Sequence, residues 1–119
     1  MAVTLFTSGT GNGGAAFTVT TEHSLASCNV AGAFSFEIDT SLMAVGDAIE
    51  IRAYTIMLTG GTKRLTFVAM YAGAQSTLDV SKVSIPVVND LTDANSVEFS
   101  VKQTIGTGRA MPWKVTRSN

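Results

Sequence analysis

Short segments in which apolar and polar residues alternate recur along this chain. In residues 33–39 large apolar residues occupy every second position, and residues 97–102 repeat the pattern. A period of two places the apolar side chains on one face of a β-strand, as in an antiparallel sheet with one buried face. No segment of useful length shows helical periodicity. About six to eight such strands, with turn residues roughly every ten positions, predict an all-β fold: an antiparallel β-sandwich, jelly-roll-like in its topology.

Turn and breaker residues refine this expectation. The run Thr59–Thr62 contains two glycines between two strand-like segments, and it predicts a hairpin because glycine accepts the positive φ angles of a tight turn. In the first of these segments, residues 48–58, the alternation changes face, which predicts a β-bulge near Tyr54. Pro86 falls inside a further extended segment, residues 80–88. Because proline cannot donate to a sheet ladder, we expect this segment at a sheet edge or at the start of a strand.

The first fifteen residues differ from the rest of the chain. They carry a dense group of glycines, which has high chain entropy and offers few side chains for packing. We therefore expect a flexible Gly-rich N-terminal arm over residues 1–15 and a single β-sandwich domain over residues 16–119. Leu5 and Phe6 could anchor the arm on a neighbouring subunit, and the alternative is a frayed terminus. The arm residues expected to contact a partner are Leu5, Phe6, Gly9, Gly11, Gly13 and Gly14.

The chain carries little charge. Charged residues make up 14% of the sequence, against about 25% in an average soluble protein. Part of the surface is therefore expected to be covered by a partner, and the alternative is a neutral β domain rich in Ser and Thr. The net charge of −1 lacks the basic footprint of a nucleic-acid-binding domain. No run of about 18 apolar residues occurs, so we expect no membrane-spanning helix.

The C-terminal part of the chain is basic. After Glu98 there is no further acidic residue, whereas Arg109, Lys114 and Arg117 follow. These residues could dock on an acidic surface, or they could line a solvated strand. Trp113 lies among them and could stack on a base or a sugar, or pack in the core or against a partner subunit.

The sequence offers little for catalysis or metal binding. His23 is the only histidine, and in a strand its neighbours Glu22 and Ser24 point to the opposite face, so the run does not form a catalytic triad. One histidine and the single cysteine, Cys28, do not provide the ligand spacing of a zinc site. With one cysteine no internal disulfide forms, which fits synthesis in a reducing cytoplasm. We expect no enzymatic activity, no metal and no cofactor.

Several motifs, in their order along the chain, resemble a known family. They are Thr21–Leu25, the strand ending at Ile38-Asp39, Gly46–Arg52, Gly60–Arg64 and Gly106–Val115. Over about residues 17–117 this order resembles small virion proteins of tailed bacteriophages. Proteins of this size and type in such phages resemble capsid decoration, or cement, proteins. The resemblance implies a dimer or trimer on the outer capsid that clamps neighbouring major capsid subunits, and it implies no catalytic residues.

The resulting expectation is a phage virion structural protein, made in the host bacterial cytoplasm and located on the capsid surface. It would bind and stabilise the lattice of the major capsid protein, and it would associate with itself as a homodimer or homotrimer, without nucleic acid or membrane. The alternatives are a head–tail connector, tail or fibre component, and a non-catalytic carbohydrate-binding module. The expected partner contacts outside the arm are Arg109, Trp113, Lys114 and Arg117.

Overall fold

The computed structural model describes residues 3–58, 60–90 and 96–118. These residues form nine strands, and no helix long and apolar enough to cross a membrane occurs among them. The strands are β1 (Val3–Thr10), β2 (Glu22–Cys28), β3 (Gly32–Asp39), β4 (Ala48–Thr55), β5 (Arg64–Ala72), β6 (Ser81–Val83), β7 (Val87–Asn89), β8 (Val97–Ile105) and β9 (Pro112–Ser118).

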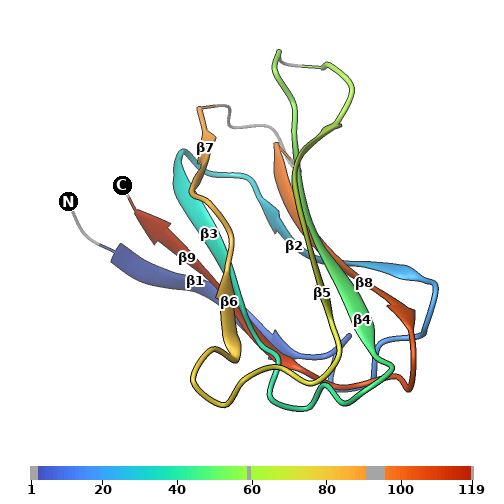
Figure 1. Ribbon diagram of the computed structural model, residues 1–119. Coiled ribbons are helices and arrows are strands. Elements are labelled where there is room, and N and C mark those ends of the chain that lie inside the picture. The colour runs from blue at the N-terminus through green and yellow to red at the C-terminus, as the bar shows by residue number, and fades with distance from the viewer. Residues whose placement is uncertain (1–2, 59, 91–95, 119) are drawn as a thin grey trace.

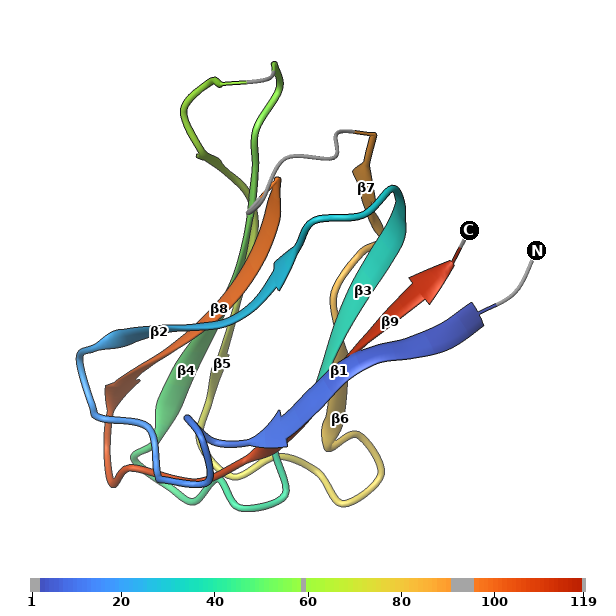
Figure 2. The same cartoon turned by 180° about the vertical axis from the view of Figure 1, so that it is seen from behind.

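The strands form two antiparallel sheets that face each other (Figures 1 and 2). One sheet has the order β1-β9-β3-β6, with β7 also pairing with β3, and the other has the order β2-β8-β4-β5. The start of β1 and the end of β9 lie side by side, since Val3 pairs with Ser118. The prediction of an all-β fold with two antiparallel sheets, as in a β-sandwich, is confirmed.

The space between the sheets is filled by the apolar faces that the alternation predicted. Phe34, Phe36 and Ile38 of β3 are fully buried. Phe36 stacks on Phe99 of β8, with 5.7 Å between ring centroids, so an aromatic pair joins the two sheets at their centre. Each of these rings buries a large apolar area, and together they make β3 and β8 the central strands of the core.

The predicted hairpin is formed by β4 and β5. The pairing runs from Ala48 with Ala72 to Thr55 with Arg64, and its register shifts between Ala53 and Tyr54, which confirms the predicted bulge. The connection is longer than the glycine pair suggested, because the N–H of Ile56 leaves the ladder and donates to the carbonyl of Ser96 at 3.1 Å. Thr59, the first residue of the predicted turn, lies outside the described residues.

The segment around Pro86 lies at a sheet edge, as predicted. It is divided into two three-residue strands, β6 and β7, which pair with the two ends of β3. Together they occupy the position of one interrupted strand. Pro86 lies between them, where no ladder hydrogen bond is required.

The residues expected to form a flexible arm begin with an edge strand. Strand β1 pairs with β9 from Val3 to Thr10. The glycines after it form a turn, in which the N–H of Gly11 donates to the carbonyl of Met111 at 2.9 Å and Gly13 and Gly14 have φ angles of 64° and 91°. The chain then reaches Phe17, whose side chain is buried in the core. From Val3 to Thr10 the segment expected to be a flexible arm is thus paired with β9 of its own domain.

Candidate functional site

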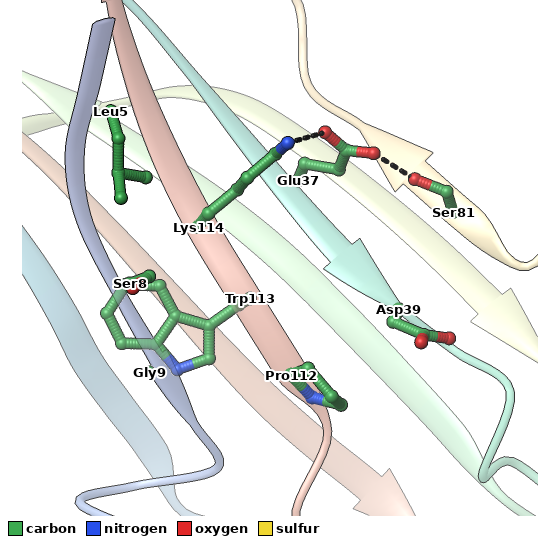
Figure 3. Close-up of a pocket in the computed structure, with 9 residues that line it drawn as sticks. All are labelled: Leu5, Ser8, Gly9, Glu37, Asp39, Ser81, Pro112, Trp113 and Lys114. Atoms are coloured by element: carbon green, nitrogen blue, oxygen red, sulfur yellow. Dashed lines mark hydrogen bonds and ion pairs between the residues drawn. The ribbon is translucent and has the colours of Figure 1, made fainter.

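The outer face of the five-stranded sheet carries an open cavity beside β1 (Figure 3). Its volume is about 410 Å³, and its walls come from β1, β3, β6 and β9. Four of the predicted partner contacts line it, namely Leu5, Gly9, Trp113 and Lys114. The other lining residues are Ser8, Glu37, Asp39, Ser81 and Pro112.

Trp113 forms one wall of this cavity, and its position depends on Gly9. The two residues are paired across β1 and β9, and the indole lies against the bare backbone of Gly9. The indole N–H donates to the carbonyl of Gly11 at 2.9 Å, and the ring stacks on Phe36 with 5.9 Å between centroids. Only 9% of Trp113 is exposed, so the ring is fixed in the domain and offers little of its surface to the outside.

The rim of the cavity is polar and carries both signs of charge. Glu37 and Lys114 are directly paired across β3 and β9, and their charged groups are 3.5 Å apart. The hydroxyl of Ser81 donates to the second carboxylate oxygen of Glu37, which gives a chain of side chains across three strands (Figure 3). Asp39 adds another carboxylate, and its Oδ1 accepts from the N–H of Ser41 at 2.9 Å. Exposed ion pairs of this kind contribute at most about 1 kcal/mol to stability, so both charges remain available to a partner.

Leu5 and Phe6 point to opposite faces of the sheet. Leu5 is 61% exposed beside the cavity, whereas Phe6 packs edge-on against Phe34 of the core, with 5.2 Å between centroids. A register shift between Leu5 and Thr7 shows a bulge at this point of β1. Leu5 is therefore an exposed apolar side chain of the strand, and Phe6 is its anchor in the domain.

Arg109 lies away from the cavity, in the turn between β8 and β9. Its Nε donates to Asp47 Oδ2 at 2.8 Å, and its backbone N–H donates to the side chain of Gln103 at 3.1 Å. Asp47 is almost fully buried, and it also accepts from the N–H groups of Ala44 and Thr107. These contacts, first the hydrogen bond from Ala44, outweigh burial and lower the pKa of Asp47. Arg109 is thus used to fix two loops together.

Arg117 lies near the other end of β9. Its Nε and Nη2 donate to the carbonyl of Ala31 at 3.0 and 2.7 Å. The basic residues of the C-terminal part therefore do not form one patch. Of the three, only Lys114 belongs to the cavity, and Gly11, Gly13 and Gly14 form the turn after β1 rather than part of its lining.

The sequence interpretation missed the residues of β3 and β6 in this site. Glu37 and Asp39 were placed on the polar face of their strand by the alternation, which is the available signal. Their position beside Lys114 follows from the pairing of β3 with β9, which joins segments about 75 residues apart, and short-range patterns do not reveal such pairing. No pattern in the sequence around Ser81 indicated that it would belong to this site.

The outer face of the four-stranded sheet is internally paired. Glu22 accepts from Arg52 and Tyr54, both at 2.6 Å, and from Ser100 at 2.5 Å. Burial alone would raise the pKa of Glu22, but these donors together lower it. Arg52 is also bonded to Glu50. The charged groups of this network are less exposed, at 18–30%, than Lys114 and Glu37 on the cavity rim, at 50% and 35%, so the network offers less charge to a partner.

His23 and Cys28, the residues considered for catalysis or metal binding, are used in the packing and hydrogen bonding of the domain. His23 Nε2 accepts the N–H of Thr18 at 3.0 Å, and Nδ1 lies 3.1 Å from the side-chain amide of Asn12, so the ring ties together the loop before β2. Cys28 is fully buried, and burial raises the pKa of its thiol to about 12. Among the described residues no group of three or more His, Cys, Asp or Glu side chains could hold a metal ion.

Comparison with known proteins gave no match: no protein-family model, no curated protein and no solved structure resembles this chain closely enough to be reported.

Proposed function

We propose that this chain is a structural protein of a tailed-bacteriophage virion, and specifically a capsid decoration protein that binds the lattice of the major capsid protein. The observation that carries the proposal is the cavity face of the five-stranded sheet. There an exposed Leu5 lies beside a rigid Trp113 wall, and a Lys114–Glu37 pair forms the rim. An apolar centre with a polar, charged rim is the usual composition of a protein–protein interface.

The strand order supports a second part of the proposal, that the sandwich is a jelly roll. In chain order, β1 to β4 alternate between the two sheets, and β4 and β5 then form a hairpin within one sheet. The later strands pair with the earlier ones: β6 and β7 with β3, β8 with β2 and β4, and β9 with β1 and β3. Strands β6 and β7 together take one position, which reduces nine strands to the eight of a jelly roll. Jelly rolls are frequent in viral capsid and lectin domains.

The surface composition agrees with a protein that is covered when it assembles. Charged residues are few, and several large apolar side chains are more than half exposed, among them Val3, Leu5 and Val45. A protein bound in many copies to a shell buries such residues on assembly. Because it binds the assembled shell and not the free subunits, it shifts the equilibrium towards the shell by mass action.

The packing of Trp113 favours this proposal over a carbohydrate-binding module. A sugar stacks on the open face of an aromatic ring, but one face of Trp113 lies on Phe36 and its N–H is already bonded to Gly11. The other alternative, a connector, tail or fibre component, would use the same face and differs only in the partner. The experiment below separates the two.

The test is co-sedimentation with virion parts. The purified protein is mixed with expanded capsids that lack it, and separately with isolated tails, and the mixtures are pelleted. We expect the protein to pellet with capsids and not with tails. Leu5→Asp and Lys114→Glu should each weaken capsid binding by about tenfold or more, because a charge is buried or reversed at the interface. Leu78→Asp, at a loop residue that is 95% exposed and outside the cavity, is the matched control and should bind normally.

Three other outcomes of the sedimentation experiment would contradict or change the proposal. A wild-type protein that stays in the supernatant with capsids would show the proposal to be wrong. Pelleting with tails alone would replace it with the tail or connector alternative. Equal loss in Leu78→Asp and Leu5→Asp would show that the cavity face is not the contact surface.

A further inference from the structure

Strand β5 is an edge strand without the usual protection. Among the described residues it forms a ladder only with β4, so the backbone N–H and C=O groups along its other side have no strand partner. It is nine residues long, and residues 65–72 contain no charge, no glycine and no proline. Its bulge lies at its beginning, which leaves residues 67–72 in a regular ladder. Such an edge is a template for pairing with another strand.

The other edges of the sandwich carry the devices that prevent such pairing. Strand β1 has a bulge at Phe6, its fourth residue, and a glycine near its end, and β2 has a bulge in its middle. Strands β6 and β7 have three residues each, with Lys82 in one and Pro86 between them. Charges, bulges, prolines and short length are the known protections of edge strands. Residues 67–72 of β5, by contrast, carry none of these features.

In the regular part of β5, residues 67–72, the exposed side chains are apolar as well. Val68 is 48% exposed and Met70 is 71% exposed, and both lie on the outer face of the four-stranded sheet, opposite Arg52 and Glu50 of β4. Phe67 and Tyr71 point the other way and pack against the core. A strand added to this edge would therefore need apolar residues on both of its faces.

We propose that β5 pairs with β5 of a second copy of this chain, antiparallel and centred on Ala69, so that the two four-stranded sheets join into one. In this register Val68 lies opposite Met70 of the other copy on the outer face, and Phe67 lies opposite Tyr71 on the inner face. Apolar and aromatic cross-strand pairs of this kind stabilise antiparallel sheets. A two-fold axis through Ala69 makes the contact closed, which gives a dimer and removes both edges.

Charge also fits a second copy as the occupant. In this register the one charged residue of the strand, Arg64, falls opposite Ala74 of the other copy, just beyond the end of its β5. There Lys82 lies over the ring of Tyr71 at 5.0 Å and is bonded to Asp79, whose side chain is 74% exposed. The antiparallel dimer thus directs Arg64 towards an exposed carboxylate. A parallel arrangement would instead set the two Arg64 residues side by side.

This dimer surface differs from the cavity face and does not depend on capsid binding, so the two proposals fail separately. The test is sedimentation velocity of the full chain over a range of concentrations, with no capsid present. We expect a reversible monomer–dimer equilibrium. Val68→Lys and Met70→Glu should each raise the dissociation constant by about tenfold or more, because a charge replaces an apolar cross-strand contact in both halves of the dimer. Far-UV circular dichroism verifies that each variant is folded.

A double variant tests the register itself. In the chain with both Val68→Lys and Met70→Glu, each lysine lies opposite a glutamate of the other copy, so the double variant should regain most of the affinity that the single variants lose. The pair Val68→Lys and Met70→Lys should not regain it. Val3→Lys, on the edge strand of the other sheet, is the matched control and should dimerise like the wild type.

The wild-type chain provides a measurement that does not depend on any variant. Hydrogen exchange at the amides of residues 67–71 should slow as the protein concentration rises, while exchange in β1 stays constant. A wild-type protein that is monomeric at every concentration, a trimer, or a dimer that Val3→Lys disrupts and Val68→Lys does not would overturn the proposal.

Discussion

Gly9 and Trp113 lie directly opposite each other across β1 and β9, and a methyl group added at Gly9 would come within 2.8 Å of the indole Cζ2. The ring has no room to move away, because its N–H is bonded to Gly11 and its far side rests on Phe36. The pair therefore joins the edge strand β1 to the core, and it shapes one wall of the proposed contact surface.

Replacing this glycine should loosen β1. We expect Gly9→Ala to lower the free energy of unfolding by about 1–3 kcal/mol, the usual cost of an added methyl group in a tightly packed place. Urea denaturation measures it. Ser8→Ala, next in the strand but directed outward, should change the free energy by less than about 0.5 kcal/mol. Equal stability of Gly9→Ala and the wild type would mean that the Trp113 ring moves freely.

Asp47 should make stability depend on pH in the acid range. Its pKa is lowered in the folded state, first by the hydrogen bond from the N–H of Ala44 and also by Thr107 and Arg109. A carboxyl group whose folded pKa lies below its unfolded value of about 4 adds stability above that pH, and this stability is lost as the pH falls through the folded pKa. Acid should therefore weaken the fold by uncoupling the two loops that Asp47 joins.

The corresponding variant is Asp47→Asn, studied by urea denaturation at several pH values. At neutral pH we expect a loss of about 1–3 kcal/mol, because the amide presents a donor where the carboxylate accepted a hydrogen bond. The difference from the wild type should begin to shrink below about pH 4, where the unfolded chain binds the proton, and should shrink further as the pH falls through the lowered pKa of the folded state. A difference that stays constant from neutral to acid pH would show that Asp47 is not the group responsible.

The local part of the structure could be predicted from the sequence. The alternation around Phe36 identified a half-buried strand and its polar face, and the change of face near Tyr54 identified a bulge. Both depend on side chains a few residues apart, where the period of a strand is decisive. The same is true of Pro86, whose missing N–H has a purely local effect.

The candidate site could be predicted only in part, because it depends on strand pairing over long distances in the chain. Leu5 and Trp113 were both expected to contact a partner, but they belong to strands at opposite ends of the sequence, and their meeting is a result of the β1–β9 ladder. Arg109 was grouped with Lys114 by charge alone. Its bond to Asp47 crosses 62 positions, and nothing in the local pattern indicated it. The glycine-rich start looked mobile because its pairing with β9 was not visible.

Cys28 should be unreactive in the native protein. Its side chain is fully buried, and burial raises the pKa of the thiol to about 12, so almost no thiolate exists at neutral pH. We expect iodoacetamide to label Cys28 only after unfolding in urea. Rapid labelling of one thiol per chain without denaturant would contradict the burial and would indicate that β2 opens readily.

The fluorescence of Trp113 should report its packing, since it is the only tryptophan in the chain. With 9% of the residue exposed and the ring stacked on Phe36, we expect a blue-shifted emission that acrylamide quenches weakly, and a red shift with strong quenching in urea. The Phe36→Leu variant, which keeps an apolar side chain but removes the stacked ring, should increase quenching while Phe34→Leu changes it less. Adding oligosaccharides should leave the native emission unchanged, because no face of the ring is open to a sugar. A saturable change in emission with one glycan would instead favour carbohydrate binding at this residue.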